Sequence, residues 1–261
     1  MSETLTVFSA TLAATAALMV AVWLLSLVKK DASIVDICWG PGFVLIGAVC
    51  YLTTNGYHAR KLLITALVAV WGLRLALHIL LRNKGKGEDF RYKAMRARFG
   101  DKFPVVSLFT VFGLQGLLMW IISLPIQIAE ISREPARLTW LDWAGAAIWL
   151  TGFLFESIGD AQLALFKADL GNKGKVMDRG LWRYTRHPNY FGDALLWWGL
   201  FVMALSTPDG AWTVISPLLM TGLLMKVSGV ALLEKTLTRT KPEYNDYVRR
   251  TSAFFPWIPR G

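Results

Sequence analysis

The chain has 261 residues, a net charge of +10, 54% hydrophobic residues and a mean hydropathy of +0.43. This composition excludes an ordinary soluble protein, because long apolar runs with few charges are typical of membrane-spanning helices. The positive charge therefore indicates basic loops on one side of a membrane rather than a nucleic-acid partner.

Seven apolar runs, taken in chain order, approach the ~20 residues that a helix needs to cross a bilayer. They extend roughly from Leu5 to Val28, Ser33 to Tyr51, Leu62 to Leu81, Val105 to Ile128, Trp140 to Phe166, Tyr190 to Leu205 and Trp212 to Leu233. Each run is expected to be helical, because backbone groups inside lipid must be satisfied within the segment. The sequence predicts an all-α, polytopic membrane protein with about seven transmembrane helices and a single domain over residues 1–261.

Basic residues gather on one side of these runs. Of the 28 Lys and Arg, 22 follow the first, third or fifth run or lie in the C-terminal tail. The positive-inside rule then places the N-terminus outside and the C-terminus in the cytoplasm. We expect an integral protein of a bacterial inner membrane, with chemistry open to the cytoplasm at the basic segments 82–104, 167–189 and 234–261.

A polar bend at 180–193, reading GLWRYTRHPNYFGD, joins the fifth and sixth runs. Pro188 fixes its own φ and keeps His187 out of the helical region, so a helix is expected to begin just after it. Asn189 then lies at a helix start, where unpaired N–H groups and the positive dipole end attract anions. With Arg183 and Arg186, this bend predicts a phosphate cradle. The alternative is a basic loop that rests against lipid headgroups.

Ionisable residues inside the apolar runs are costly and so are functional candidates. Asp36 opens the second run, and Arg74 and His78 lie four residues apart on one face of the third. Glu156 and Asp160 share a face of the fifth run in the same way. The alternative for Asp36 is a neutralising pair with Arg74, or a position near the membrane face.

Glycines and charges alternate in the loop that follows the third run, which reads KGKGEDFRY at 84–92. Glycine beside basic residues lets backbone N–H groups approach a phosphate, and a GxG pattern by itself is not specific to phosphate sites. Residues 160–175 have the same character. The basic segments could converge on one cytoplasmic cavity for a compact dinucleotide with several phosphates. A soluble nucleotide-binding domain is not expected, because the chain lacks a strand-linked GxGxxG and a Walker sequence.

Three elements together resemble the steroid 5α-reductase family, and in particular its bacterial branch. These elements are RHPNY at 186–190 with Gly192 and Asp193, GEDFRY at 87–92, and the tail from Glu243 to Pro256. Isoprenylcysteine carboxyl methyltransferases carry a similar RHP-x-Y element and tail. The GEDxRY loop favours the reductase.

The resemblance implies that NADPH binds among the cytoplasmic segments and reduces the C4–C5 double bond of a 3-oxo-Δ4-steroid or a similar enone lipid. By position, Asp36 resembles the acid near the substrate carbonyl, and His78 is the second catalytic candidate. Trp71 stands where the family often has Tyr. The resemblance and the basic segments together assign these residues to the cofactor: Arg74, Asp89, Arg91, Tyr92, Asp160, Lys167, Lys175, Arg179, Tyr184, Arg186, His187, Asn189, Asp193 and Glu234.

Hydride delivery to the β-carbon of an enone builds negative charge on the carbonyl oxygen, which a hydrogen-bond donor stabilises. A carboxylic acid can donate only while protonated, and apolar burial favours that form. No metal site is predicted. We expect a lipid substrate that enters from the bilayer, contact with membrane lipid, no nucleic-acid partner and a monomer. The alternatives are an S-adenosylmethionine-dependent isoprenylcysteine-type methyltransferase and a non-enzymatic binder or transporter of sterols or lipids.

Overall fold

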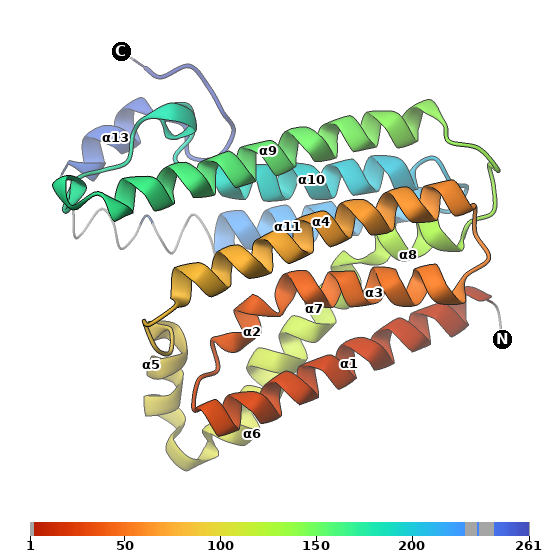
Figure 1. Ribbon diagram of the computed structural model, residues 1–261, viewed down its shortest axis with the longest axis horizontal. Coiled ribbons are helices and arrows are strands. Elements are labelled where there is room, and N and C mark those ends of the chain that lie inside the picture. Colours follow the sequence, from red (N-terminus) through yellow and green to blue (C-terminus); the bar gives the residue numbers. More distant parts are fainter. Residues whose placement is uncertain (1–2, 228–233, 235–242, 261) are drawn as a thin grey trace. The chain divides into compact units, whose positions relative to one another are not determined.

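The computed structural model describes residues 3–227, 234 and 243–260, and all regular secondary structure in these ranges is helical (Figure 1). By its internal contacts the chain divides into two compact units. Unit 1 holds residues 1–139 and 204–213, and unit 2 holds residues 140–203 and 214–261.

Three long helices form the frame of unit 1. They are α1 (Glu3–Lys29), α3 (Trp39–Thr53) and α4 (His58–Asn83), with the single turn α2 (Ile34–Ile37) before α3. Helix α3 packs against both α1 and α4 (Figure 1). A Cβ atom on Gly40 would lie 2.0 Å from the carbonyl oxygen of Gly72, so the backbones of α3 and α4 are in direct contact. Small residues at a helix crossing allow this approach.

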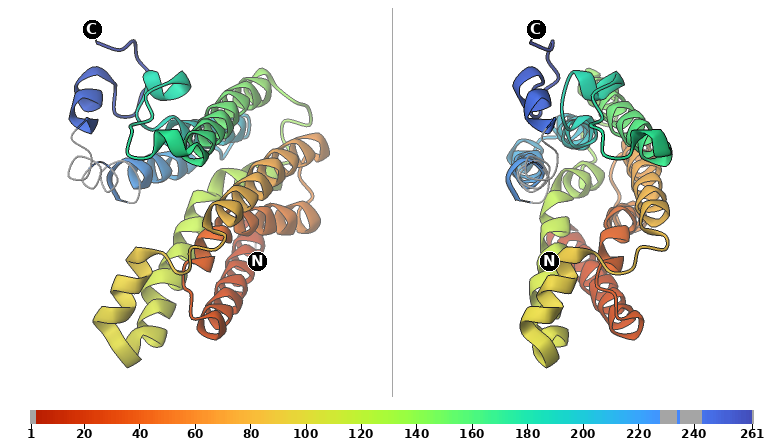
Figure 2. Two further views of the ribbon diagram at one scale, coloured as in Figure 1. Left: turned by 60° about the vertical axis from the view of Figure 1, so that its left-hand side comes forward. Right: turned by 90° about the vertical axis from the view of Figure 1, so that its left-hand side faces the viewer.

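The second half of unit 1 is a chain of shorter helices. It runs through α5 (Phe90–Phe99), η1 (Gly100–Lys102), α6 (Phe103–Ser107), the π-helical η2 (Leu108–Gly113), α7 (Leu114–Ile122) and α8 (Leu124–Ile131). Figure 2 shows α5 and α6 at one end of the unit. A buried hydrogen bond from Thr11 Oγ1 to Gln127 Oε1, 2.8 Å long, ties α1 to α8.

Two of the predicted apolar runs are interrupted by a break between helices. The second run breaks at Cys38, between α2 and α3, and the fourth breaks at Ser123, between α7 and α8. Proline accounts for both breaks, because it has no N–H to donate to the carbonyl four residues earlier. Pro41 cannot bond to Ile37 in this way, and Pro125 cannot bond to Ile121.

Unit 2 is built on α9 (Trp140–Ala168) and α10 (Pro188–Ala204). Its other elements are η3 (Leu170–Asn172), η4 (Gly180–Arg183), α11 (Ile215–Gly222), the π-helical η6 (Leu223–Val227) and α13 (Tyr244–Arg250), while η5 (Ala211–Val214) crosses the unit boundary in the chain. Helix α10 begins at Pro188, which confirms the helix start predicted at the RHPNY bend. The end of the seventh run, at 228–233, lies outside the described residues.

Helices α9 and α10 are in backbone contact through glycines. A Cβ atom on Gly192 would lie 2.4 Å from the backbone nitrogen of Glu156, and one on Gly152 would lie 2.5 Å from that of Leu196. Side chains larger than hydrogen cannot fit at this crossing. The contact brings the polar residues of both helices, described below, to one end of the pair.

Three helical stretches are long and apolar enough to cross a membrane: Glu3–Lys29, His58–Asn83 and Phe90–Ile122. Trp39–Thr53 and Ala211–Lys226 are shorter apolar helices. On α4 the large apolar side chains Leu73, Leu77 and Leu81 are more than half exposed, as expected for residues that face lipid tails. The chain therefore has the helices of a membrane protein. The other predicted crossings, and the orientation, stay predictions.

Candidate functional site

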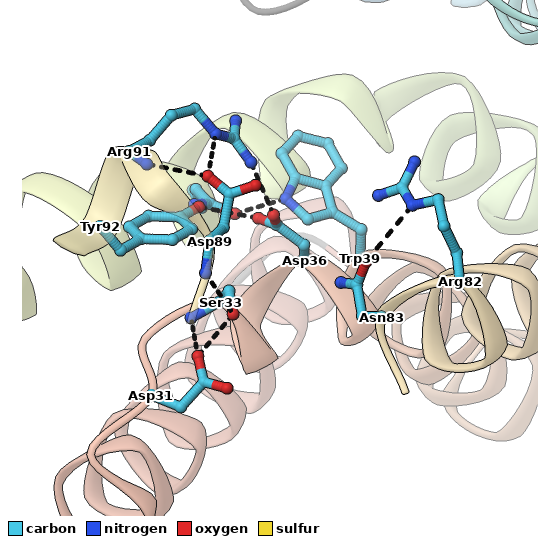
Figure 3. Close-up of polar contacts among 10 residues, drawn as sticks. Asp31, Ser33, Asp36, Trp39, Arg82, Asn83, Asp89, Arg91 and Tyr92 are labelled. Atoms are coloured by element: carbon cyan, nitrogen blue, oxygen red, sulfur yellow. Dashed lines mark hydrogen bonds and ion pairs between the residues drawn. The ribbon is translucent and has the colours of Figure 1, made fainter. Parts of the chain in front are cut away.

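Asp36 lies at the centre of a polar network at one end of unit 1 (Figure 3). Its Oδ2 atom accepts a 2.9 Å ion-paired hydrogen bond from Nη2 of Arg91, and its Oδ1 atom accepts a 2.7 Å hydrogen bond from the phenol of Tyr92. Asp36 comes from α2, whereas Arg91 and Tyr92 come from the first turn of α5. The sequence suggested Arg74 as the partner of Asp36. In the structure the partners of Asp36 are instead Arg91 and Tyr92 of α5.

The network continues from the phenol into the helices. Tyr92 Oη accepts a 3.2 Å hydrogen bond from Nε2 of Gln115, and Gln115 Oε1 accepts a 2.5 Å hydrogen bond from the indole nitrogen of Trp39. We call Asp36, Trp39, Arg91, Tyr92 and Gln115 the Asp36 network. Tyr92 is buried and Asp36 is 18% exposed. The phenol oxygen of Tyr92 donates to Asp36 and accepts from Gln115, so it has a defined position.

The GED element holds α5 against α2. Asp89 caps α5, since its carboxylate accepts bonds from the backbone N–H of Arg91 at 2.9 Å and from Arg91 Nε at 2.8 Å. Oε1 of Glu88 accepts a 2.8 Å hydrogen bond from the backbone N–H of Ala32. The same oxygen lies 2.8 Å from Nη2 of Arg96, with which Glu88 forms an ion pair. Burial raises the pKa of Glu88 and of Asp89, but these arginine contacts outweigh it and leave each pKa below its usual value. The predicted phosphate contact of this loop stays a prediction, and here its acids bind within the chain.

Trp71 makes a packing contact. Its ring lies 5.5 Å from that of Phe43, and the side chain is 1% exposed. The two other residues that the sequence singled out on α4, Arg74 and His78, are half-buried. Both make interactions of their own, but neither is among the contacts of Asp36. In unit 1 the structure therefore joins Asp36 with Asp89, Arg91 and Tyr92, all predicted site residues.

In unit 2 the RHPNY bend carries a buried ion cluster. The guanidinium of Arg186 pairs with Glu234 through Nε at 2.7 Å and Nη2 at 3.1 Å, and Nε2 of His187 lies 3.2 Å from Glu234 Oε1. Arg186 and His187 are 7% and 3% exposed. We call these three residues the Arg186 cluster. Burial raises the pKa of Glu234, but hydrogen bonds from His187 and Arg186 outweigh it and lower this pKa to about 2.

The C-terminal tail binds this bend through main-chain hydrogen bonds. The N–H of Arg186 donates to Ser252 at 2.9 Å, and the N–H of Trp257 donates to Tyr184 at 2.9 Å. Arg186 Nη1 also donates to the carbonyl oxygen of Val248 at 3.0 Å and to that of Thr251. Of the three predicted cofactor segments, 167–189 and the described part of 234–261 therefore meet within unit 2. Arg186 holds them together.

A second pair of predicted residues lies at the α9–α10 crossing. Nδ2 of Asn189 donates a 3.0 Å hydrogen bond to Oδ1 of Asp160, which is buried. Oδ1 of Asn189 is buried without a partner in the part of the chain that the structure describes. One turn further along α10, Asp193 is half-buried. This end of α9 and α10 therefore presents oxygen acceptors.

Two hollows flank the bend and the tail in unit 2. The first, of about 600 Å³, is the arginine pocket, lined by Asp178, Arg179, Gly180, Arg183, Tyr247, Arg250, Thr251, Pro259 and Arg260. The second, of about 260 Å³, is the apolar groove, lined by Phe155, Leu181, Tyr184, Pro256, Trp257 and Ile258. Arg179 and Tyr184, both predicted to bind the cofactor, thus line different hollows, while Lys167 and Lys175 are exposed.

Sequence reasoning missed several residues of these sites. Gln115 is one of two amides in the fourth apolar run, and an amide there is a usable signal for a polar contact inside a helical bundle. Arg250 and Arg260 were counted only as tail charges. No sequence pattern brings them to Arg179 and Arg183, because the tail has to fold back to the bend.

The family of this chain follows from comparison with known proteins. The model of a family of proteins of unknown function, DUF1295, matches residues 22–251. The chain belongs to this family. An uncharacterized protein of Schizosaccharomyces pombe is 24% identical over 261 residues, a match that covers 90% of this chain and 75% of that protein. No solved structure matches the chain.

Proposed function

We propose that this chain is a membrane reductase that uses NADPH to reduce the C4–C5 double bond of a 3-oxo-Δ4-steroid or a similar enone lipid. The observation that carries the proposal is the 2.7 Å hydrogen bond between Tyr92 and Asp36. A phenol and a carboxyl group, placed together near the end of apolar helices, form an acid pair that can polarise a carbonyl oxygen.

The residues of the Asp36 network divide this work. One hydrogen is shared between the Tyr92 and Asp36 oxygens, and rotation of the phenolic O–H turns it toward a carbonyl oxygen bound alongside. The developing negative charge on that oxygen is then stabilised by a donor whose position Gln115 fixes. Arg91 remains paired with Asp36 and keeps its charge compensated. Tyr92 thereby supplies the phenol that Trp71 cannot.

The acceptors and cations of unit 2 fit the cofactor by their chemistry. Asn189 offers a buried oxygen without a partner in the described chain, next to Asp160, and such acceptors suit ribose hydroxyls. The basic residues between Lys167 and Arg186 suit phosphates, including the 2′-phosphate that distinguishes NADPH from NADH. When bound, NADPH would supply the hydride for the β-carbon, and the α-carbon would then take a proton from solvent. Arg186, His187 and Glu234 position this end of α10 in the proposal.

The proposed topology has seven crossings, with the N-terminus outside and the C-terminus in the cytoplasm of a bacterium. It rests on the seven apolar runs and on the distribution of Lys and Arg. The three helical stretches that are long and apolar enough to cross a membrane support it. A substrate that enters from the bilayer agrees with such a fold.

An enzyme assay tests the proposal directly. Detergent-purified protein is mixed with NADPH and a 3-oxo-Δ4-steroid, and the loss of nicotinamide absorbance is followed. We expect turnover with NADPH and a smaller rate with NADH at low concentration. Thermal shifts with NADPH and with S-adenosylmethionine separate the reductase from the methyltransferase. A thermal shift with S-adenosylmethionine and none with NADPH contradicts the reductase, because a reductase has to bind NADPH.

A further inference from the structure

The arginine pocket of unit 2 holds more positive charge than the chain itself neutralises. Four guanidinium groups line it, from Arg179, Arg183, Arg250 and Arg260. The one carboxylate in the lining, that of Asp178, lies 3.8 Å from Nη2 of Arg250. Like charges around one hollow repel one another, and a bound anion relieves that repulsion. The pocket therefore has the charge of an anion-binding site.

The donors of this pocket are also largely unused. Within the described ranges, the side chains of Arg179, Arg183 and Arg260 make no hydrogen bond or ion pair. Arg186, a few residues away, differs in this respect because its donors are taken by Glu234 and by tail carbonyls. Guanidinium groups bind phosphate oxygens with two parallel hydrogen bonds. Several open guanidinium groups around about 600 Å³ fit a phosphate group.

Apart from Phe155 of α9, the apolar groove is formed by the same two stretches of chain as the arginine pocket. In the bend, Gly180 and Arg183 line the pocket, while Leu181 and Tyr184 line the groove. In the tail, Trp257 and Ile258 line the groove, and the next two residues line the pocket. Trp257 and Ile258 are 74% and 77% exposed, although both are large and apolar. A cationic hollow beside an exposed apolar groove matches an amphiphile with an anionic head.

We propose that this surface binds an anionic membrane phospholipid, with its phosphate in the arginine pocket and an acyl chain along the apolar groove. The occupant follows from charge and from setting, since the chain has the helices of a membrane protein and its tail carries aromatic and basic residues together. This site is separate from the Asp36 network and does not need the proposed reductase activity, but Arg179 and Arg183 also lie in the segment proposed for the NADPH phosphates, so the lipid and the cofactor would compete for them. A free phosphate would use the pocket but would gain nothing from the groove.

Lipid binding to the full-length, detergent-purified protein tests this proposal. Mixed micelles with phosphatidylglycerol or phosphatidylcholine are compared by native mass spectrometry, with inorganic phosphate and NADPH as competitors. We expect phosphatidylglycerol to bind at least about tenfold more tightly than phosphatidylcholine. Removal of Arg183 and Arg250, in R183Q, R250Q and the double variant, should weaken phosphatidylglycerol binding by about ten- to hundredfold. Arg98→Gln removes an exposed charge elsewhere and serves as the matched control.

The groove is tested with Trp257→Ser and Ile258→Ser, which should weaken lipid binding and leave inorganic phosphate binding unchanged. The thermal unfolding of each variant establishes that it is folded. Equal binding of the two lipids, or full binding by the folded double arginine variant, overturns the proposal. Inorganic phosphate that displaces the lipid from wild type and from the groove variants equally would identify a free-phosphate site instead. Displacement by NADPH at concentrations near its own Kd would assign the pocket to the cofactor.

Discussion

The phenol of Tyr92 donates a 2.7 Å hydrogen bond to Oδ1 of Asp36, across 56 residues of sequence. This contact joins the turn before α3 to the first turn of α5. It also places a neutral donor beside a carboxylate that already has a guanidinium partner. In the proposed reductase, the pair is the group that meets the substrate carbonyl.

Tyr92→Phe should lower kcat for enone reduction by about 10²–10³-fold, the usual cost of one lost oxyanion donor. The ring remains, so the folded structure should persist with a small change in stability. Steady-state rates and thermal unfolding of the purified variant measure both effects. Tyr51→Phe is the matched control in the same unit. A Tyr92→Phe enzyme with normal kcat would remove the phenol from the mechanism.

Asp36→Asn and Asp36→Leu separate two roles of the acid. Asparagine keeps an oxygen for Tyr92 or Arg91 and should retain part of the turnover. Leucine leaves both donors without their acceptor, at about 1–3 kcal/mol for each buried unsatisfied group, and should lose far more activity. Turnover and cofactor affinity are compared on folded protein. Near-normal turnover of Asp36→Leu would exclude a catalytic role.

Arg186→Ala should raise the KM for NADPH by up to about a hundredfold, because Arg186 positions the end of α10 at which we propose that the cofactor binds. The contacts of Arg186 add a second expectation. Its loss strips Glu234 and two tail carbonyls of their donor, and breaking such a buried pair costs about 3–5 kcal/mol. The tail should therefore become sensitive to limited proteolysis. Arg186→Lys should reverse less than half of the rise in KM and of the loss in protease resistance. Lysine has a single side-chain nitrogen and cannot form the two parallel hydrogen bonds that a guanidinium makes with Glu234. An unchanged KM and a protease-resistant tail would contradict both expectations.

Glu234 should make folding sensitive to acid. Its folded pKa of about 2 lies below the ordinary value of 4.5, so its contribution is fully present above about pH 4.5 and is lost as the pH falls toward 2. The full contribution is on the order of 3 kcal/mol. The unfolding midpoint of wild type should therefore fall more steeply between about pH 4.5 and pH 2 than that of Glu234→Gln. The exposed Glu243→Gln is the control, and equal slopes for all three proteins would exclude this linkage.

Gly192→Ala should destabilise unit 2 by about 1–3 kcal/mol, because the added Cβ lies 2.4 Å from the backbone of α9. Gly222→Ala is the matched control. A Cβ at that position of α11 meets nothing within 4 Å, and a helical alanine should stabilise by about 0.5–1 kcal/mol. Thermal unfolding of both variants measures the difference. A neutral Gly192→Ala would show that α9 and α10 do not touch there.

The sequence by itself determined the class of the protein. Apolar runs and a one-sided distribution of Lys and Arg predict helices in a membrane, since lipid satisfies no backbone polar group. Pro188 determined where α10 begins, because a prolyl ring fixes the local backbone. The motifs also selected Asp36, Tyr92, Arg186 and Glu234 as site residues.

Only the tertiary structure decided which of these residues meet. Asp36 pairs with Arg91 rather than Arg74, and Arg186 pairs with Glu234, 48 residues further along the chain. Such contacts depend on where helices break and on how closely they pack, and local sequence does not encode distances between distant segments. The arginine pocket has the same origin, because the tail forms it only by folding back to the bend.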